Sequence, residues 1–409
     1  ISPLTCATFG DAKWLLQLAT WQKINVQAHW SAAQKEERDF VQLFIDNDSA
    51  KIIVQNLIMS WVWRYEVRPL LGENAQKGIR GYFCEFSESV FSNLLTLLCF
   101  HASVITAIKE LSLDLAEYCL SYIKKICVDI IEEDELDKSL AALHILRYLV
   151  ENGECLPPSV PAFLMRENDV LVLLISLIEK RPWFKTDEKG RHRRVQNKWV
   201  PDQADKMGEI DSNEAQVWLS IYSIYASKIF LQNYELTEYR KEHLLRLRRY
   251  LNDLVIDQIP VLAQFSEHLS RLLISATSSQ YTVNPFIISQ IPYLKTNYIK
   301  EFRENIAQQK DIFQSQIGSD DQHALDELVD AFSAVVPFVE SRIERICASC
   351  GSPAGKRCSR CKKMWYCSRE CQIKDYKDKH KKVCSAIGAE VKKDTNVSEE
   401  VKVPQIIKE

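Results

Sequence analysis

Glycine is scarce in this chain, with 11 in 409 residues, where usual content is roughly 7%. The sequence also lacks G-x-G-x-x-G, a Walker loop, G-x-S-x-G and H-E-x-x-H. The common backbone arrangements that bind phosphates are therefore missing. This argues against the common nucleotide-dependent enzymes.

Long apolar runs and a strong net charge are missing as well. The longest apolar run, VLVLLISLI at 170–178, has nine residues, which is less than half of a membrane span. The net charge is −3, so the whole chain shows no general affinity for nucleic acid or membrane. No basic stretch followed by an apolar one opens the sequence. We expect a soluble intracellular protein without membrane insertion.

No proline occurs between Pro69 and Pro157, and apolar residues recur there at helical spacing. One helical face comprises Leu115, Cys119, Ile123, Ile126, Cys127 and Ile130. A second comprises Leu136, Leu140, Leu143, Leu146 and Leu149 and stops at Asn152-Gly153. A third run extends from Phe163 to Ile178. This succession favours an all-α body of armadillo-like kind, although no clean repeat period is found.

The polar stretch 185–213 interrupts the helices, and we interpret it as an exposed loop or linker. Its basic run at 191–194 is either a nuclear localisation signal or part of a solvated loop. Asp211 and Glu214 have capping-box spacing, and helices resume at 214. The predicted organisation is an N-terminal helical region at 1–184, the loop, a C-terminal helical region at 214–346, a cysteine-rich segment at 347–384 and a charged tail at 385–409.

Seven of the 13 cysteines fall in the cysteine-rich segment, while the other six are scattered over the first 155 residues. The spacing is C-x2-C, C-x2-C, C-x3-C and H-x3-C, which gives four pairs of ligands. Tetrahedral Zn²⁺ takes four ligands, so we expect two closed, structural sites, one Cys₄ and one Cys₃His. A 38-residue segment is too small to be stabilised by a hydrophobic core alone, and we expect zinc binding to stabilise its fold.

The same segment carries 11 Lys and Arg against three Asp and Glu. Seven thiolates and two Zn²⁺ together carry −3, which lowers the net charge to about +5. Lysines beside thiolate sites also stabilise the ligands. We therefore expect no nucleic-acid partner.

The string CSRCKKMWYCSRECQ and the eight ligands resemble a MYND-type zinc finger. The resemblance implies an interleaved arrangement, with Cys347, Cys350, Cys367 and Cys371 on one zinc, and Cys358, Cys361, His380 and Cys384 on the other. MYND fingers bind short proline-containing peptides. The matching groove positions are Ser359, Gln372 and Tyr376, where the family usually has Trp at the last; this departure puts the peptide preference in doubt.

Four segments of the body also resemble a family of MYND-finger proteins: LAALHILRYL at 140–149, LISLIEKRPW at 174–183, QVWLSIYSIY at 216–225 and LLRLRRYLNDLVIDQIPVL at 244–262. That family is implicated in cytoplasmic preassembly of axonemal dynein arms. The resemblance implies a non-enzymatic adaptor that works with dynein chains, leucine-rich-repeat assembly factors, heat-shock chaperones and immunophilin-type co-chaperones. It implies a cytoplasmic location, including centriolar satellites, the centrosome and the apical cytoplasm near basal bodies.

Two other roles are weighed against this one. A nuclear transcriptional corepressor adaptor would use the same finger. A MYND-containing lysine methyltransferase would insert the finger within a β-rich SET domain near the N-terminus, whereas here the finger follows a helical body and no SET-like motif is present.

Overall fold

The computed structural model describes residues 5–34, 37–72, 75, 77–128, 132–188, 190–195, 197–202, 209–274, 290–315, 317–333, 347–350, 354, 356–358, 364–381 and 384. The chain divides into two compact units, residues 1–334 and 335–409, and each is described by itself. The predicted all-α class is confirmed, because helices dominate and the sheets are small. The armadillo-like arrangement stays a prediction.

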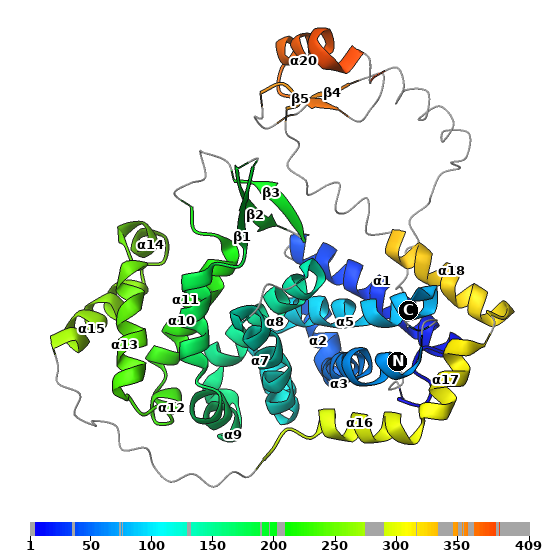
Figure 1. The fold of residues 1–409 in the computed structure, drawn as a ribbon, viewed down its shortest axis with the longest axis horizontal. Coiled ribbons are helices and arrows are strands. Elements are labelled where there is room, and N and C mark those ends of the chain that lie inside the picture. The colour runs from blue at the N-terminus through cyan, green and yellow to red at the C-terminus, as the bar shows by residue number, and fades with distance from the viewer. Residues whose placement is uncertain are drawn as a thin grey trace. The chain divides into compact units, whose positions relative to one another are not determined.

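The first half of the larger unit is a stack of helices that pack pairwise, α3 on α5, α7 on α8 and α1 on α5 (Figure 1). The predicted helical faces are confirmed on α7 and α8, where Leu115, Cys119, Ile123 and Ile126 and the five leucines of 136–149 are buried. Cys127 of the first face is half-buried, and Ile130 lies outside the described residues. The elements are α1 (Ala12–Gln34), α2 (Glu37–Asp46), α3 (Ser49–Val62), η1 (Trp63–Val67), η2 (Arg68–Leu70), α5 (Ile79–Leu98), α6 (Ala102–Ala107), η3 (Lys109–Leu111), α7 (Ser112–Val128) and α8 (Glu133–Glu151).

Shorter helices follow, and they correct two sequence-based expectations. The run from Phe163 to Ile178 is broken at Asp169, which takes φ 44° and accepts a hydrogen bond from Arg240 Nε at 2.7 Å. A single helical face is also expected from the spacing of Leu244, Leu247, Leu251, Leu254 and Ile256, but this stretch is divided among three elements. These helices are η4 (Gly153–Cys155), α9 (Ser159–Ala162), η5 (Phe163–Glu167), α10 (Val170–Lys180), α11 (Ser212–Ala226), α12 (Lys228–Leu231), α13 (Glu238–Arg246), η7 (Leu247–Arg249), α14 (Asp253–Gln258) and α15 (Leu262–Ile274).

The start of α11 is capped by Asp211, as the sequence predicts, but without the reciprocal bond of a capping box. The Asp211 side chain accepts from the backbone N–H of Asn213. Glu214 instead binds Arg181 Nη2 at 2.7 Å. The side chain at the third helical position therefore ties α11 to the end of α10.

The last helices of the larger unit return to its first ones: α16 (Leu294–Glu304), α17 (Ile306–Gln314) and α18 (Ser319–Ser333). In Figure 1, α18 lies beside α1, and α16 lies beside α3. The fully buried Gln309 donates to the backbone oxygens of Cys6 and Phe9, both at 3.1 Å. Asp114 on α7 accepts from the backbone N–H groups of Tyr293 and Leu294 at 2.8 and 2.7 Å, and so caps α16 from another helix. The two predicted helical regions thus share one core.

A three-stranded antiparallel sheet occupies most of the segment that was interpreted as a loop. Its strands, in spatial order, are β1 (Phe184–Asp187), β2 (Gly190–Val195) and β3 (Lys198–Pro201). Asp187 pairs with Gly190 and Val195 with Lys198, and Gly190 and Asn197 take positive φ values of 113° and 61°. The loop interpretation is wrong over these strands because the arginines of β2 are paired with acidic side chains, which makes a basic segment compatible with a sheet.

The basic run lies on β2 and is engaged in ion pairs. Arg194, only 5% exposed, donates two hydrogen bonds of 2.8 and 2.7 Å to Asp137 on α8 and a third of 3.0 Å to Glu133. Arg193 binds Asp202. Arg194 thus joins the sheet to α8, and Arg193 binds the residue that follows β3, which favours a structural role over a nuclear localisation signal.

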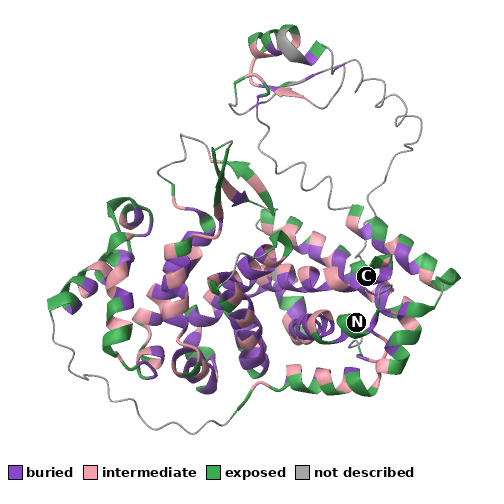
Figure 2. Cartoon of the chain, in the orientation of Figure 1, coloured by how far each residue is buried: buried purple, intermediate pink, exposed green. Residues whose placement is uncertain are grey.

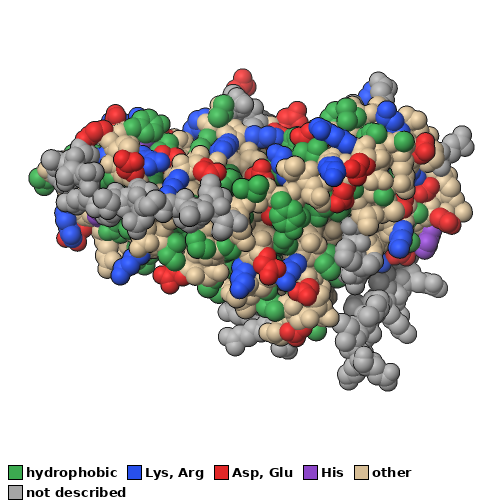
Figure 3. Space-filling model, turned by 90° about the horizontal axis from the view of Figure 1, so that it is seen from below, with side chains coloured by type: hydrophobic (Ala, Val, Ile, Leu, Met, Phe, Trp, Pro, Cys, Tyr) green, Lys and Arg blue, Asp and Glu red, His purple; other side chains and the backbone are tan. Residues whose placement is uncertain are grey.

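The core is rich in large rings, and the surface is mixed in charge. Figure 2 shows buried residues along the inward faces of the helices. Five tryptophans are fully buried there: Trp14, Trp21, Trp63, Trp183 and Trp218. On the face seen in Figure 3, described basic and acidic side chains are intermixed. Among the described helices, none has both the length and the apolar character needed to cross a membrane.

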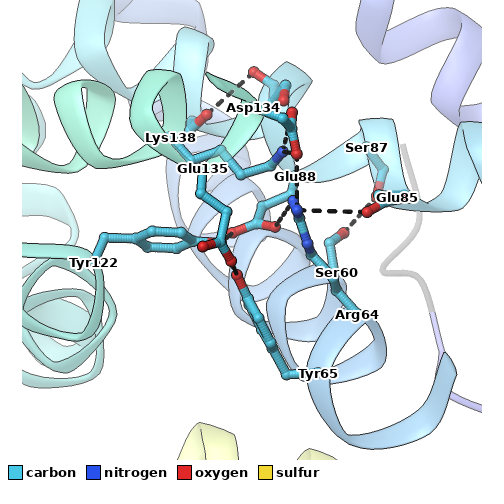
Figure 4. A network of polar contacts seen from close by, with 12 residues as sticks. Ser60, Arg64, Tyr65, Glu85, Ser87, Glu88, Tyr122, Asp134, Glu135 and Lys138 are labelled. Atoms are coloured by element: carbon cyan, nitrogen blue, oxygen red, sulfur yellow. Dashed lines mark hydrogen bonds and ion pairs between the residues drawn. The ribbon is translucent and has the colours of Figure 1, made fainter. Parts of the chain in front are cut away.

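A network of polar side chains crosses the core between η1, α5, α7 and α8 (Figure 4). At its centre is Glu88, whose side chain is 0% exposed. Tyr122 donates to Glu88 Oε1 at 2.5 Å, and Arg64 Nη1 lies 3.6 Å from Oε2. Arg64 also reaches Asp134 at 2.7 Å and Glu85 at 3.4 Å. Desolvation raises the pKa of Glu88, although Lys138 and Arg64 oppose that rise.

Candidate metal centre

The cysteine-rich unit is built on a two-stranded sheet and a helix. Strand β4 (Lys356–Arg357) pairs antiparallel with β5 (Trp365–Tyr366), and α20 (Arg369–Asp375) continues into the π-helix η8 (Tyr376–His380). Tyr366, fully buried, donates its hydroxyl hydrogen to Asp375 at 2.7 Å and so joins the sheet to the helix. Ser368 caps α20 by accepting from the N–H of Cys371.

The first cluster brings together Cys347, Cys350, Cys367 and Cys371, whose sulfur atoms all lie within 4.8 Å of one another. Cys350 and Cys367 are 3.4 Å apart, and Cys367 and Cys371 are 3.5 Å apart. The first pair precedes the sheet, and the second pair follows β5 and enters α20. The small sheet therefore carries residues from distant parts of the segment to one point.

The second cluster consists of Cys358, His380 and Cys384, all buried. Cys358 Sγ lies 3.8 Å from Cys384 Sγ and 3.4 Å from His380 Nε2. Cys358 follows β4, while the other two lie at the end of η8 and beyond it. The eighth predicted ligand, Cys361, lies outside the described residues.

The two groups of donors fit zinc. Four ligands at Zn–S distances near 2.3 Å stand about 3.8 Å apart at tetrahedral corners, and a sulfur and an imidazole nitrogen about 3.6 Å apart. The sulfur–sulfur distances of 3.4, 3.5 and 3.8 Å and the sulfur–nitrogen distance of 3.4 Å are close to these values. Thiolates and a neutral imidazole are also the donor types that zinc prefers.

The protonation of free thiols in the first cluster would be unequal. Hydrogen bonds with the thiols of Cys350, Cys371 and Cys347 raise the pKa of Cys367 to about 12. Desolvation acts against ionisation of Cys347, but backbone N–H groups of Cys367, Ser349 and Cys350 outweigh it and lower the pKa of Cys347. A divalent cation would allow all four sulfurs to be thiolates.

The family model for the MYND finger matches residues 347–384. These residues are a MYND finger. The grouping implied by the family resemblance is the one that the described donors adopt, with seven of the eight residues in the two expected clusters. Tyr366 is buried in the finger, and Met364 and Trp365 pack against the same small core.

Beyond the MYND finger, the chain is similar along nearly its whole length to the zinc finger MYND domain-containing protein 10 homolog of Drosophila melanogaster. Identity is 25% over 441 residues, covering 94% of this chain and 96% of that protein. The family resemblance noted from the sequence is thereby confirmed. No solved structure matches the chain.

Two plant proteins match only a short stretch. Ubiquitin C-terminal hydrolase 15 of Oryza sativa subsp. japonica is 53% identical over 38 residues, which are 9% of this chain and 4% of that protein. Ubiquitin carboxyl-terminal hydrolase 19 of Arabidopsis thaliana is 50% identical over 38 residues, or 9% and 6%. Such short matches carry no hydrolase activity over to this chain.

The predicted peptide-contact residues of the MYND finger are only partly visible. Ser359 lies outside the described residues. Gln372 and Tyr376 are both half-buried and stand four residues apart on the α20–η8 helix, so they share a face. The Tyr376 ring contacts the His380 ring, with centroids 6.1 Å apart. The contribution of these residues to peptide binding stays a prediction.

Proposed function

We propose that this protein is a non-enzymatic adaptor that assists the cytoplasmic preassembly of axonemal dynein arms. One observation carries the proposal, namely the similarity to zinc finger MYND domain-containing protein 10 homolog over 94% of this chain. A MYND finger at the end of a helical body agrees with a protein that binds other proteins. The dynein role itself comes from the family resemblance noted in the sequence.

In this proposal two Zn²⁺ ions are structural. Cys347, Cys350, Cys367 and Cys371 hold one ion, and Cys358, Cys361, His380 and Cys384 hold the other. The ions tie the sheet to α20 and η8, because their ligands lie on or beside both. Each ion would have four protein ligands and no position open for water, which is typical of a structural site. The finger then presents Ser359, Gln372 and Tyr376 to a partner peptide.

The helical body binds a client or a chaperone, while the finger docks one further protein. The proposed partners are dynein chains, leucine-rich-repeat assembly factors, heat-shock chaperones and immunophilin-type co-chaperones. The proposed location is the cytoplasm, including centriolar satellites, the centrosome and the region near basal bodies. Nucleic acid is not a partner in this scheme.

Affinity purification of the tagged full chain from cells that build motile cilia tests the proposal. Retained proteins are identified by mass spectrometry for the wild type, for Cys358→Ala and for Cys155→Ala. Cys155 is exposed and lies outside the finger, so its replacement is a matched control. We expect dynein chains and chaperones with the wild type and the control, and the loss of a subset of partners with Cys358→Ala.

Recovery of chromatin proteins, with a steady nuclear pool of the tagged chain, would instead support the corepressor role. Recovery of dynein chains with no difference between Cys358→Ala and the wild type would refute the docking role of the finger.

A further inference from the structure

We propose that a pocket in the helical body binds a neutral, proline-containing, extended peptide of a partner protein. The site is separate from the MYND finger and goes beyond the function proposed above. The pocket measures about 340 Å³ and lies where the ends of α1 and α5 meet α8. That volume is within the range of ligand pockets. Its lining residues are His29, Ala32, Thr96, Leu97, Phe100, His101, His144 and Tyr148.

Exposed aromatic rings mark this pocket. Phe100 is 64% exposed, and Trp30, next to His29 in the chain, is 45% exposed. The Phe100 ring stands almost perpendicular to the rings of His101 and Tyr148, at centroid distances of 5.3 and 5.9 Å. Large rings left in water around a concave site are typical of interaction surfaces, because a partner covers them on binding.

The lining contains no Lys, Arg, Asp or Glu, and its titratable side chains are Tyr148 and three histidines. The neighbouring Arg147 is paired with Glu151 at 3.0 Å. Burial lowers the pKa of His144, so its imidazole stays neutral at physiological pH. A charged ligand would lose its water here without meeting an opposite charge. The pocket therefore favours a neutral ligand.

The pocket nevertheless offers hydrogen-bonding groups, and their directions can be assigned. Asn213 Nδ2 donates to Asp211 Oδ1 at 3.0 Å, which turns Asn213 Oδ1 towards His144 Nε2 at 3.2 Å. His144 Nε2 must then carry the proton, and Nδ1 is an acceptor. Burial also raises the pKa of Tyr148, whose hydroxyl therefore remains a donor. The pocket thus combines a donor, an acceptor and aromatic rings.

An extended peptide with prolines matches this combination. In the polyproline II conformation the backbone makes no internal hydrogen bonds, so its carbonyl groups can accept from Tyr148, and the N–H of a non-proline residue can donate to His144. Pyrrolidine rings pack on aromatic rings, and the stiff backbone loses little entropy on binding. A helical peptide satisfies its own backbone and would leave the polar groups of the pocket unused.

The test is a fluorescence-polarisation titration of the full chain with a labelled Ala-Pro repeat peptide about ten residues long. A Gly-Ser repeat of equal length is the control peptide. We expect saturable binding of the Ala-Pro peptide only. Phe100→Ala should raise Kd about tenfold, because it removes the exposed ring. Tyr148→Phe keeps the ring but removes the donor, and should raise Kd about threefold to tenfold.

Two variants serve as controls. Tyr239→Ala removes a ring that is 59% exposed on α13, outside the pocket, and should leave Kd unchanged. Cys358→Ala disturbs the MYND finger, which is itself proposed to bind a partner peptide, so binding that persists in this variant is assigned to the pocket. The proposal is overturned if binding does not saturate below about 1 mM, if the Gly-Ser peptide binds equally well, or if Phe100→Ala has no effect. Loss of binding with Cys358→Ala alone would place the peptide on the finger instead.

Discussion

Replacement of Arg64 by Met should destabilise the helical body substantially. Arg64 is 10% exposed, and its nearest fully buried partner is Glu88, 3.6 Å away. Above the folded-state pKa of Glu88, where the carboxylate is ionised, the pair interacts at that distance by about 4 to 5 kcal/mol for an effective dielectric constant near 20. Tyr122 and Lys138 remain beside Glu88 in the variant, and the carboxyl group can also take up a proton. We therefore expect a loss of about 3 kcal/mol in the free energy of unfolding.

A double-mutant cycle isolates the contribution of the pair. Glu88→Gln keeps the shape of the side chain and removes its charge. In that background, Arg64→Met should cost less, with a coupling of about 2 kcal/mol between the two positions. The ion pair with Asp134 adds little to this figure, because the Asp134 side chain is 56% exposed.

Urea unfolding followed by tryptophan fluorescence measures these values, since five fully buried tryptophans report on the helical body. Arg271→Met is the matched control: Arg271 pairs with Glu267 on the surface, with side chains 71% and 67% exposed, so its replacement should cost less than about 0.5 kcal/mol. A loss below about 1 kcal/mol for Arg64→Met, or strict additivity in the cycle, would refute the reasoning.

Three further predictions concern pH, metal and the return of the last helices. Because burial raises the pKa of Glu88 in the folded state, its stabilising contribution is full below the ordinary value of 4.5 and falls as pH rises through the folded-state pKa. The stability of the wild type relative to Glu88→Gln should therefore decline as pH rises above 4.5 in urea titrations, and a constant difference would contradict this. The wild type should contain about two zinc ions per chain by elemental analysis, and Cys350→Ala about one, with the unfolding of residues 1–334 unchanged; equal zinc content in both would refute the assignment. Asp114→Ala should lower the free energy of unfolding by about 1 to 2 kcal/mol and speed proteolysis after residue 290, because α16 loses its cap. Replacement of the exposed Asp326 by Ala is the control and should match the wild type. Equal cleavage rates for the two variants would contradict the capping role.

The sequence predicts the clustered cysteine and histidine side chains of the finger, because metal ligands must recur at short, defined spacings. Which pairs share a metal does not follow from spacing, and only the family resemblance implied the interleaved grouping that the described residues adopt. The helices with long apolar faces, α7 and α8, were also predictable, since burial of one face requires a period of 3.6 residues.

Features that depend on distant partners were not predictable. Asp169 interrupts the helical run predicted from 163 to 178, where it takes a left-handed conformation and its carboxylate binds Arg240, 71 residues away. The segment 184–201 resembles a polar loop in the sequence because it is rich in charged residues. It can form a sheet because its arginines are neutralised by acidic residues on α8 and beyond β3, which the sequence does not reveal. In the sequence, Glu85 and Glu88 look alike, and only the packing of η1, α7 and α8 makes the second a fully buried carboxylate.

The return of α16–α18 to the first helices has a consequence for biosynthesis. Gln309 and Phe9 are joined across 300 residues of chain, and Trp63 stacks on Phe313. At usual rates of synthesis, about 15 to 60 s separate the emergence of these partners from the ribosome. During that interval α16–α18 have not yet been made, so the apolar surface that they cover in the finished protein stays exposed. A nascent chain stalled before α16 would therefore depend on a holding chaperone, even though most of its helices had already been made.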